Sequence, residues 1–303
     1  MARPVLHIGG GSNLLFTDDF KGTILHSKIN FIEILDEASD VLVSVGAGVV
    51  FDDFCAWAAK EGLWGVENLS YIPGEVGASA VQNIGAYGVE VKDVIKTVYC
   101  YDTFEEEFVS FGVEECEYGY RDSIFKDPEV KGRYIVTHVV FALSRTPNPR
   151  LDYGHLKEAV ESAGAEVTPS LIRRVIIKIR KEKLPEPSVM GSAGSFFKNP
   201  VISAEHFARI ETAAKTELGA DCKVPHYDLP DETVKVPAAW LIEQCGWKGR
   251  RSGGAAVYDK QPLVIVNYTG EAYPEEIVGL ERRIIASVKA KFDIELHPEV
   301  EHI

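Results

Sequence analysis

The sequence predicts an α+β protein made of two or three domains. Its 303 residues, of which 46% are hydrophobic, are enough to bury more than one core. Short strand-like stretches, such as residues 4–8 and 41–45, alternate along the chain with segments of helical periodicity. Loops rich in glycine interrupt these elements, and such loops let the backbone approach a ligand closely.

Most of the predicted strands lie in the first half of the chain. They cover residues 4–8, 23–29, 41–45, 94–101 and 133–144. Between the third and the fourth strand, apolar side chains recur at helical spacing, which predicts a helix with a buried face. These side chains are Phe51, Phe54, Cys55 and Ala58, and Gly62 is the expected end of the helix. Residues 146–149 form a proline-rich linker.

Four more helices are predicted in the second half, each from its first residues and its apolar face. Ser170 and Ser203 are expected N-caps, Pro237 and Pro274 are expected at helix starts, and Gly246 is expected to end the third helix, residues 238–245. The apolar faces of the other three are Ile172, Val175, Ile176 and Ile179; Phe207, Ile210, Ala214 and Leu218; and Ile277, Leu280, Ile284 and Val288.

Composition narrows the class of protein. The net charge of −14 argues against a nucleic-acid partner, because an anionic ligand would need local cations. The five cysteines show no CxxC pair and the eight histidines no HExxH spacing, so we expect a reduced compartment and no metal site. The N-terminus does not resemble a signal peptide and no apolar run approaches about twenty residues, so we expect a cytoplasmic protein that does not insert into membranes.

The first loop that indicates a site follows the strand at residues 4–8 directly. It reads Gly9-Gly10-Gly11-Ser12-Asn13-Leu14-Leu15. Successive glycines expose backbone N–H groups and permit positive φ, so the loop can form an anion-binding nest. Its spacing matches neither GxGxxG nor a Walker A lysine loop, which argues against a Rossmann or P-loop domain.

A second loop region spans residues 70–88 and is also rich in small residues. It contains Pro73-Gly74-Glu75-Val76-Gly77-Ala78 and, after a polar pair, Gly85-Ala86-Tyr87-Gly88. Such a segment packs well if a large flat group fills the space, with backbone amides at a diphosphate and Tyr87 over a ring. A tightly wound surface loop is the alternative.

The third loop, residues 191–200, places Ser195 directly after four small residues. Phe196 and Phe197 are expected to anchor the segment, and Lys198 follows them. Upstream, a helix ends at Lys183 before Pro185. A small-residue loop between two lysines suits an anionic ligand that a serine approaches closely, whereas the alternative is an ordinary glycine turn before a buried strand.

These loops, together with residues 116–126 and 297–300, resemble sequence motifs of the UDP-N-acetylenolpyruvoylglucosamine reductases. The motifs follow one another in the same order as in that family and span essentially the whole chain. The resemblance implies the FAD-binding fold of the vanillyl-alcohol-oxidase type, with two flavin subdomains, plus an α/β substrate-binding domain. The implied domains are a remnant of the first FAD subdomain at residues 1–29 with 296–303, the second FAD subdomain at residues 30–184, and the substrate-binding domain at residues 185–295. The implied reaction is the NADPH-dependent, FAD-mediated reduction of UDP-N-acetylglucosamine enolpyruvate to UDP-N-acetylmuramate in peptidoglycan synthesis, by a monomer.

The resemblance also implies roles for individual residues. Arg121 stabilises the enolate of the substrate, Ser195 donates the proton to carbon, and Glu299 hydrogen-bonds the substrate carboxylate. The implied substrate-binding residues are Tyr153, which matches the tyrosine of the longer, type I reductases, and Lys183, Asn199 and Gln261. The implied FAD-binding residues are Gly9, Gly10, Gly11, Ser12, Asn13, Leu14, Pro73, Gly74, Gly77, Ala78, Asn83, Gly85, Tyr87 and Arg180.

Two features depart from the family pattern. The family has about fifty residues ahead of the first glycine-rich loop, so we expect this chain to hold FAD weakly. The position two residues after Glu299 is often arginine in the family and is Glu301 here.

Two other functions stay open at this stage. One is a flavin oxidase of the same fold, although neither flavin loop contains the histidine or cysteine that would tether FAD covalently. The other is a nucleotide-sugar binder without catalytic activity.

Overall fold

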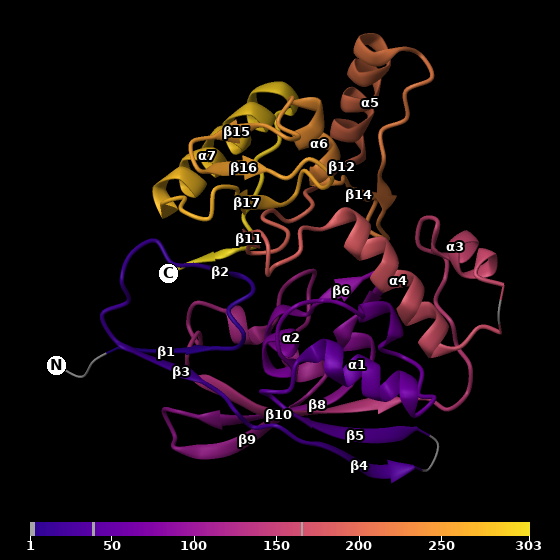
Figure 1. The fold of residues 1–303 in the computed structure, drawn as a ribbon, viewed down its shortest axis with the longest axis vertical. Helices are drawn as coiled ribbons and strands as arrows, with labels where there is room; N and C mark the ends of the chain where they lie inside the picture. The colour runs from indigo at the N-terminus through magenta and orange to yellow at the C-terminus, as the bar shows by residue number, and fades with distance from the viewer. Residues whose placement is uncertain (1–3, 38–39, 165) are drawn as a thin grey trace. The chain divides into compact units, whose positions relative to one another are not determined.

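The computed structural model describes residues 4–37, 40–164 and 166–303, which fold into two compact units (Figure 1). The first unit contains the residues up to Ser12 and Phe20–Lys181, and the second contains Asn13–Asp19 and Glu182–Ile303. The chain therefore enters the second unit briefly, just after the first three glycines, and returns to it for good near residue 182.

A five-stranded antiparallel sheet organises the first unit. Its order is β4 (Ile32–Glu37), β5 (Val41–Gly46), β10 (Tyr134–Leu143), β8 (Ile95–Asp102) and β9 (Glu107–Gly112). Residues of alternate exposure follow one another along β8, where Val98 and Cys100 are buried and Tyr99 is 37% exposed. The sheet thus has a core face.

The helices α1 (Phe51–Lys60) and α2 (Val76–Gln82) lie on one face of this sheet (Figure 1). Phe54 of α1 packs against Phe141 of β10, with ring centroids 4.7 Å apart. The predicted end of α1 is confirmed, because Gly62 follows the helix with a φ of +71°. The second loop region predicted over residues 70–88 is therefore not all loop, because its residues 76–82 form α2.

The helices α3 (Leu156–Ser162) and α4 (Pro169–Lys183) bury a smaller core with Trp64. The prediction that Ser170 caps α4 is wrong. Ser170 lies in the first turn, and its hydroxyl donates to the carbonyl of Ala59, 3.2 Å away. Thr168 is the cap, because its Oγ1 accepts a hydrogen bond of 3.1 Å from the amide of Leu171.

Shorter elements complete the first unit. The strands β1 (Val5–Ile8) and β3 (Thr23–His26) pair in parallel, and β6 (Gly85–Ala86) pairs with β7 (Val89–Glu90). The strand predicted over residues 23–29 therefore ends at His26. Four 3₁₀ turns cover Glu67–Leu69, Val91–Asp93, Glu114–Cys116 and Ile124–Lys126.

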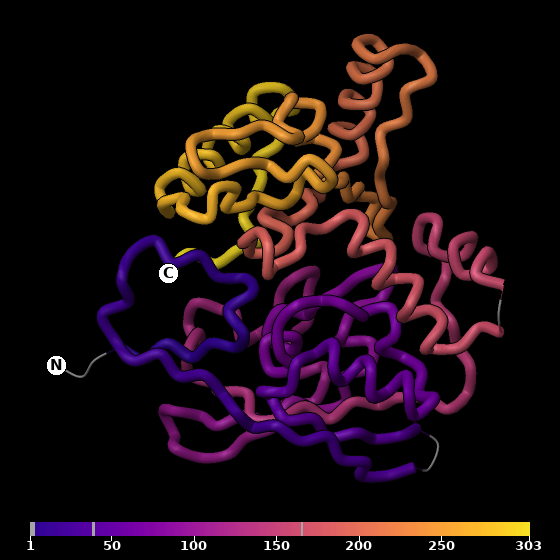
Figure 2. Tube along the Cα trace, in the orientation of Figure 1, coloured from indigo at the N-terminus to yellow at the C-terminus, as the bar shows by residue number. Residues whose placement is uncertain are grey.

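Three small sheets organise the second unit. One is antiparallel and has the order β11 (Gly191–Ser192), β17 (Ile265–Asn267), β16 (Ala255–Val257) and β15 (Arg251–Ser252). Another pairs β12 (Val201–Ser203), β14 (Thr233–Lys235) and β13 (Tyr227–Asp228). The third is a parallel pair of β2 (Leu14–Leu15) with β18 (Glu301–His302), visible in Figure 2 as the yellow trace beside the indigo one.

The helices α5 (Ala204–Leu218), α6 (Ala238–Gln244) and α7 (Pro274–Phe292) cover these sheets. Ser203 is confirmed as the cap of α5, since its Oγ accepts from the amide of His206 at 3.2 Å. The apolar face of α7 is buried as predicted. Leu218 departs from its prediction, because it is 49% exposed at the last residue of α5.

None of the helices in the described part of the chain is long and apolar enough to cross a membrane. Among the described residues, no three histidine, cysteine, aspartate or glutamate side chains are grouped so that they could hold a metal ion.

Candidate active site

The first and second glycine-rich loops lie against each other in the first unit. A Cβ added to Gly9 would lie 3.2 Å from the Cβ of Ala78, and one added to Gly74 would lie 3.1 Å from the Oγ of Ser12. Gly11 and Gly74 both have positive φ, +71° and +112°. The structure thus brings together two loops that the sequence could only indicate separately, and small side chains are needed where they meet.

The start of α2 explains Gly77 by packing. Its amide donates to the carbonyl of Ala47 at 2.9 Å, and a Cβ there would come within 2.9 Å of the Ala47 Cβ. The amide of Val76 likewise donates to the carbonyl of Val49. These two amides are used inside the protein, so an anion at these loops would be bound by other groups.

Asn83 ends α2 in the left-handed region, with a φ of +43°, and is fully buried. Its Nδ2 donates to the Glu90 carboxylate at 3.0 Å and to the carbonyl of Gly119 at 2.8 Å. Its Oδ1 accepts from the amide of Lys92 at 3.2 Å. The side chain therefore ties α2 to the β6–β7 hairpin and to the segment that precedes Arg121.

Arg121 is attached to the second loop region by its guanidinium. Its Nη1 donates to the carbonyl of Asn83 at 3.1 Å, and its Nη2 donates to the carbonyl of Gly85 at 2.7 Å. The residue has a φ of +55°, a conformation that costs free energy for a side chain of this size. The surrounding hydrogen bonds thus fix Arg121 in one orientation.

In the same unit, a hydrogen bond between Tyr87 and Arg180 links the second loop region to α4. Burial raises the pKa of Tyr87 while it lowers the pKa of Arg180. Arg180 also donates through Nε to the carbonyl of Tyr71 at 3.1 Å. Tyr153, which is 40% exposed, packs edge-on against Tyr87 with ring centroids 5.9 Å apart.

In the second unit, the loop that carries Ser195 pairs with the segment that carries Glu299. The amide of Glu299 donates to the carbonyl of Phe196 at 2.8 Å, and the amide of Lys198 donates to the carbonyl of His297 at 2.9 Å. Phe196 is buried, as is its neighbour Phe197, which confirms that the phenylalanines anchor the loop. Ser195 itself is exposed after Gly194, whose φ is +75°.

The remaining predicted residues of the second unit have separate surroundings. Asn199 accepts through Oδ1 from the amide of Ala238, at 2.9 Å, and so caps α6. Asn13 donates through Nδ2 to the carbonyl of Glu299 at 3.0 Å. Gln261 is half-buried in the turn before β17, and Lys183 is exposed at the end of α4.

Two buried polar residues beside the predicted site residues were not predicted from the sequence. Buried Asn68 donates through Nδ2 to the carbonyls of Tyr87 and Arg150, at 2.9 and 2.7 Å. Glu75 is also buried, and its Oε1 lies 2.7 Å from Nε2 of His26. The signal for Glu75 was a single charged residue in a loop of small ones, whereas Asn68 gave none.

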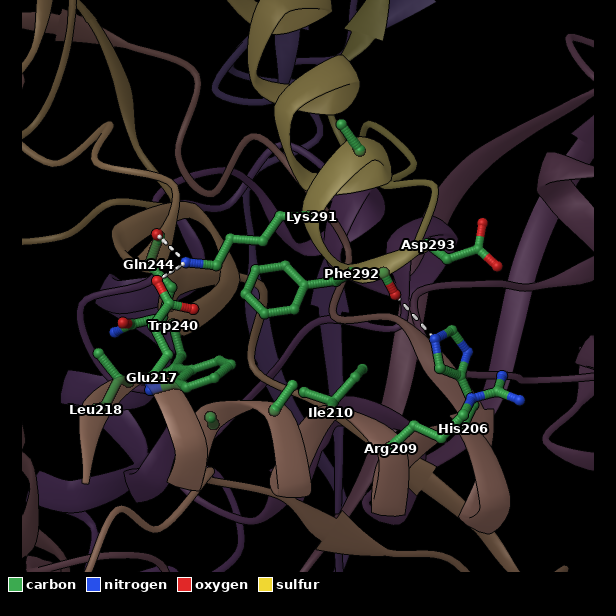
Figure 3. Close-up of a pocket in the computed structure, with 13 residues that line it drawn as sticks. His206, Arg209, Ile210, Glu217, Leu218, Trp240, Gln244, Lys291, Phe292 and Asp293 are labelled. Atoms are coloured by element: carbon green, nitrogen blue, oxygen red, sulfur yellow. Dashed lines mark hydrogen bonds and ion pairs between the residues drawn. The ribbon is translucent and has the colours of Figure 1, made fainter. Parts of the chain in front are cut away.

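A cavity of about 510 Å³ in the second unit lies apart from the predicted site residues, none of which line it (Figure 3). It is formed by α5, α6 and the end of α7. Two of its polar side chains are engaged within the protein: Lys291 donates to Glu217 at 2.8 Å, and His206 hydrogen-bonds the carbonyl of Phe292 at 2.8 Å. This cavity is therefore not the candidate active site.

Matches to two family models define the class of protein. A model of an FAD-binding domain matches residues 2–104, which carry both glycine-rich loops of the first unit. A model of the C-terminal domain of UDP-N-acetylenolpyruvoylglucosamine reductase matches residues 186–303. The two-unit fold and these matches define an FAD-dependent oxidoreductase with a separate C-terminal domain.

Individual relatives then identify the family. The chain is 52% identical to the UDP-N-acetylenolpyruvoylglucosamine reductase of Bacteroides fragilis, over 100% of this chain and 88% of that protein. It is 47% identical to the Porphyromonas gingivalis enzyme of the same name, over 98% and 85%. The crystal structure of the Thermus caldophilus reductase superposes with a TM-score of 0.66 at 25% identity, over 99% of this chain and 85% of that one. The chain belongs to the UDP-N-acetylenolpyruvoylglucosamine reductase family.

Proposed function

We propose that the protein reduces the enolpyruvyl double bond of UDP-N-acetylglucosamine enolpyruvate to give UDP-N-acetylmuramate, a precursor of peptidoglycan, with NADPH as the source of hydride. The observation that carries this proposal is the contact between the two glycine-rich loops, within a chain that matches reductases of this family over its whole length. A cofactor with a diphosphate and a flat ring suits that contact, because side chains larger than those present would obstruct it.

The residues at the contact fit FAD, which accepts hydride and passes it on when bound. Residues 9–12, Gly74 and Ala78 supply close backbone, and Tyr87 with Arg180 supplies an aromatic ring and a cation. Asn13, Leu14, Pro73 and Gly85 complete the proposed set. Gly77 and Asn83 support the site indirectly, since packing and hydrogen bonds within the protein account for both. The binding is noncovalent.

Arg121 is the proposed electrophilic residue. Its guanidinium is permanently charged and planar and has five N–H donors, two of which hold the carbonyls of Asn83 and Gly85. This anchoring suits a group that must stabilise the developing enolate of the substrate carboxylate without moving. Its positive φ also places it among strained residues, which cluster at functional sites.

Ser195 is the proposed acid that delivers the proton to carbon, and Glu299 the proposed partner of the substrate carboxylate. Two backbone hydrogen bonds join the segments that carry them, which supports placing both residues in one site of the second unit. Tyr153, Lys183, Asn199 and Gln261 bind the UDP-sugar in this proposal, Asn199 with the part of its amide that does not cap α6.

The proposed setting follows from the reaction. Supply of a peptidoglycan precursor links the protein to cell-wall formation, and through it to cell shape and cell division. We propose that it acts in the cytoplasm as a monomer, does not insert into membranes, and binds no nucleic acid, in keeping with its net charge of −14.

Two half-reactions test the proposed function. Because we expect weak binding, FAD is added to the purified protein; NADPH should then bleach the flavin in the absence of air, and UDP-N-acetylglucosamine enolpyruvate should restore the colour. Reoxidation by oxygen but not by this substrate would indicate a flavin oxidase, and a protein that binds UDP-sugar without supporting reduction of the added flavin would indicate a binder. All flavin should pass into the filtrate after denaturation, and flavin retained by the chain would disprove noncovalent binding.

The Ser195→Ala variant tests the assignment of the acid. Reduction by NADPH should keep its rate, while reoxidation by the substrate should slow by roughly 10²- to 10⁴-fold, the range for loss of a positioned acid. Ser188→Ala is the matched control, because Ser188 is exposed seven residues away and outside the paired segments. Equal reoxidation rates in Ser195→Ala and the parent would remove Ser195 from this role.

A further inference from the structure

Three ionisable side chains gather where the first and second glycine-rich loops meet. They are His7 on β1, His26 on β3 and Glu75 in the second loop, and the sequence analysis assigned none of them. The Oε1 of Glu75 lies 2.7 Å from the Nε2 of His26, and the Glu75 side chain is 8% exposed. His7 belongs to the same cluster, because Glu75 and His26 both act on its pKa, which burial lowers.

The position of Glu75 links three segments of the chain. A Cβ on Gly9 would lie 3.3 Å from Oε2 of Glu75, and one on Gly10 would lie 4.0 Å from its Cγ. His26 is opposite Ile8 in the parallel pairing of β1 and β3, and Ile8 directly precedes Gly9. The Glu75 carboxylate therefore lies beside the first loop and hydrogen-bonds His26 of the neighbouring strand, while its own backbone belongs to the second loop.

A buried carboxylate is costly unless hydrogen bonds compensate for its desolvation. Here Oε1 has His26, whereas Oε2 of Glu75 and Nε2 of His7 have no hydrogen-bond partner among the described residues. The described residues offer no grouping of three ligands for a metal, so a metal ion does not explain the cluster. A role in holding the loops does explain why a charged residue occurs among small ones.

We propose that Glu75 is a positioning residue for FAD. The Nε2–H of His26 donates to the Glu75 carboxylate, and this bond holds the second glycine-rich loop against the first in the arrangement that receives the cofactor. The inference rests on the proposed function, in which both loops hold FAD. It adds a side-chain pair that joins the loops to the backbone and ring contacts already proposed.

The test measures FAD binding to the full chain by flavin fluorescence, with the melting temperature of the flavin-depleted protein measured in parallel. Glu75→Ala and His26→Ala should each raise the Kd for FAD about 10- to 100-fold. The double variant should be at most about threefold weaker than either single variant, because the two residues act through one bond. Glu75→Gln should stay within about threefold of the parent, since its amide oxygen can accept the same hydrogen bond.

The matched control is Glu158→Ala. Glu158 also pairs with a histidine, His155, at 2.9 Å in the same unit, but both side chains are exposed on or beside α3. Its Kd for FAD should equal that of the parent. If Glu75→Ala fails to fold, His26→Ala and Glu75→Gln still test the proposal through their own affinities.

Other outcomes would overturn the inference. A melting temperature that falls while the Kd stays at the parent value means that the pair only stabilises the fold, because the protein is still folded at the temperature of the titration. Additive effects of the two alanine variants mean that no shared bond is involved. A parent that binds no FAD overturns the proposed function as well, whereas a parent that binds FAD with unchanged variants overturns the inference alone.

Discussion

Replacement of Asn83 by alanine tests how the first unit holds Arg121. The side chain of Asn83 donates to Glu90 and Gly119 and accepts from Lys92, and its carbonyl accepts from Arg121. Asn83→Ala removes the three side-chain bonds and places alanine at a φ of +43°. Alanine tolerates this left-handed conformation less well than asparagine does.

The magnitude follows from these contacts. Each lost hydrogen bond within the protein contributes about 0.5–1.5 kcal/mol, and the one to the carboxylate somewhat more. The left-handed alanine adds roughly 1 kcal/mol. Partial access of water to Glu90 offsets part of the loss, since its side chain is 28% exposed. We expect the free energy of unfolding to fall by about 3–5 kcal/mol, a large share of the roughly 5–15 kcal/mol typical of a folded protein.

Urea unfolding followed by circular dichroism measures this change in the free energy of unfolding. The rate at which the substrate reoxidises the reduced flavin, measured by stopped flow, shows whether the proposed role of Arg121 is affected. Asn83→Gly is the matched control, because it loses the same side-chain bonds but accepts positive φ. It should be about 1 kcal/mol more stable than the alanine variant. An alanine variant within 1 kcal/mol of the parent would refute the view that Asn83 holds these segments together.

Three further predictions concern a cap, an ion pair and the substrate site. Thr168→Ala should lower the free energy of unfolding by about 0.5–2 kcal/mol, whereas Ser170→Ala should have less effect; equal losses in urea unfolding would contradict the assignment of the cap. Hydrogen bonds from Arg133 lower the pKa of Asp102 to about 2, below its value of about 3.9 in the unfolded chain. The pair therefore stabilises the protein fully above pH 4, and this contribution is lost as the pH falls towards 2. The Asp102→Asn variant should be less stable than the parent at pH 6 and should lose less stability than the parent on acidification. Urea midpoints measured from pH 2 to 6 check both expectations. Tyr153→Phe should raise the KM for the UDP-sugar without changing the rate at which NADPH reduces the flavin, and an effect confined to the NADPH step would exclude Tyr153 from the substrate site.

Local patterns predicted the regular elements well. The apolar spacing of Phe51 to Ala58 and the proline at the first residue of α7 are both patterns among neighbours within a few residues, so one sequence suffices to find them. Ser170 was a wrong prediction because Thr168, two residues earlier, can cap equally well. Which of two nearby hydroxyl residues lies just before the first residue of the helix depends on the packing around them, which the sequence does not display.

The arrangement of the site was predicted less completely. The glycine-rich loops stood out because their composition is unusual. The contact between the two loops could not be predicted from the sequence. The same holds for the hydrogen bonds from Arg121 to Asn83, 38 residues away, and from His26 to Glu75, 49 residues away. Pairs so distant along the chain leave no periodic signal, and they form only when the folded chain brings their segments together.

The parallel pairing of β2 with β18 has a consequence for how the protein is made. Leu14 leaves the ribosome early, yet Glu301, its partner, is added about 290 residues later. At a synthesis rate of roughly 5–20 residues per second, that interval lasts about 15–60 s. During this time the stretch after Ser12 has no partner strand, and the side chain of Asn13 lacks the carbonyl of Glu299. The first unit can fold around its own sheet while translation continues, but the segment that leaves its first glycine-rich loop is completed only by the last residues of the sequence. A nascent chain that stalls before residue 299 would therefore present β2 without its partner strand to chaperones and proteases, although residues 9–12 of the first glycine-rich loop have long been made.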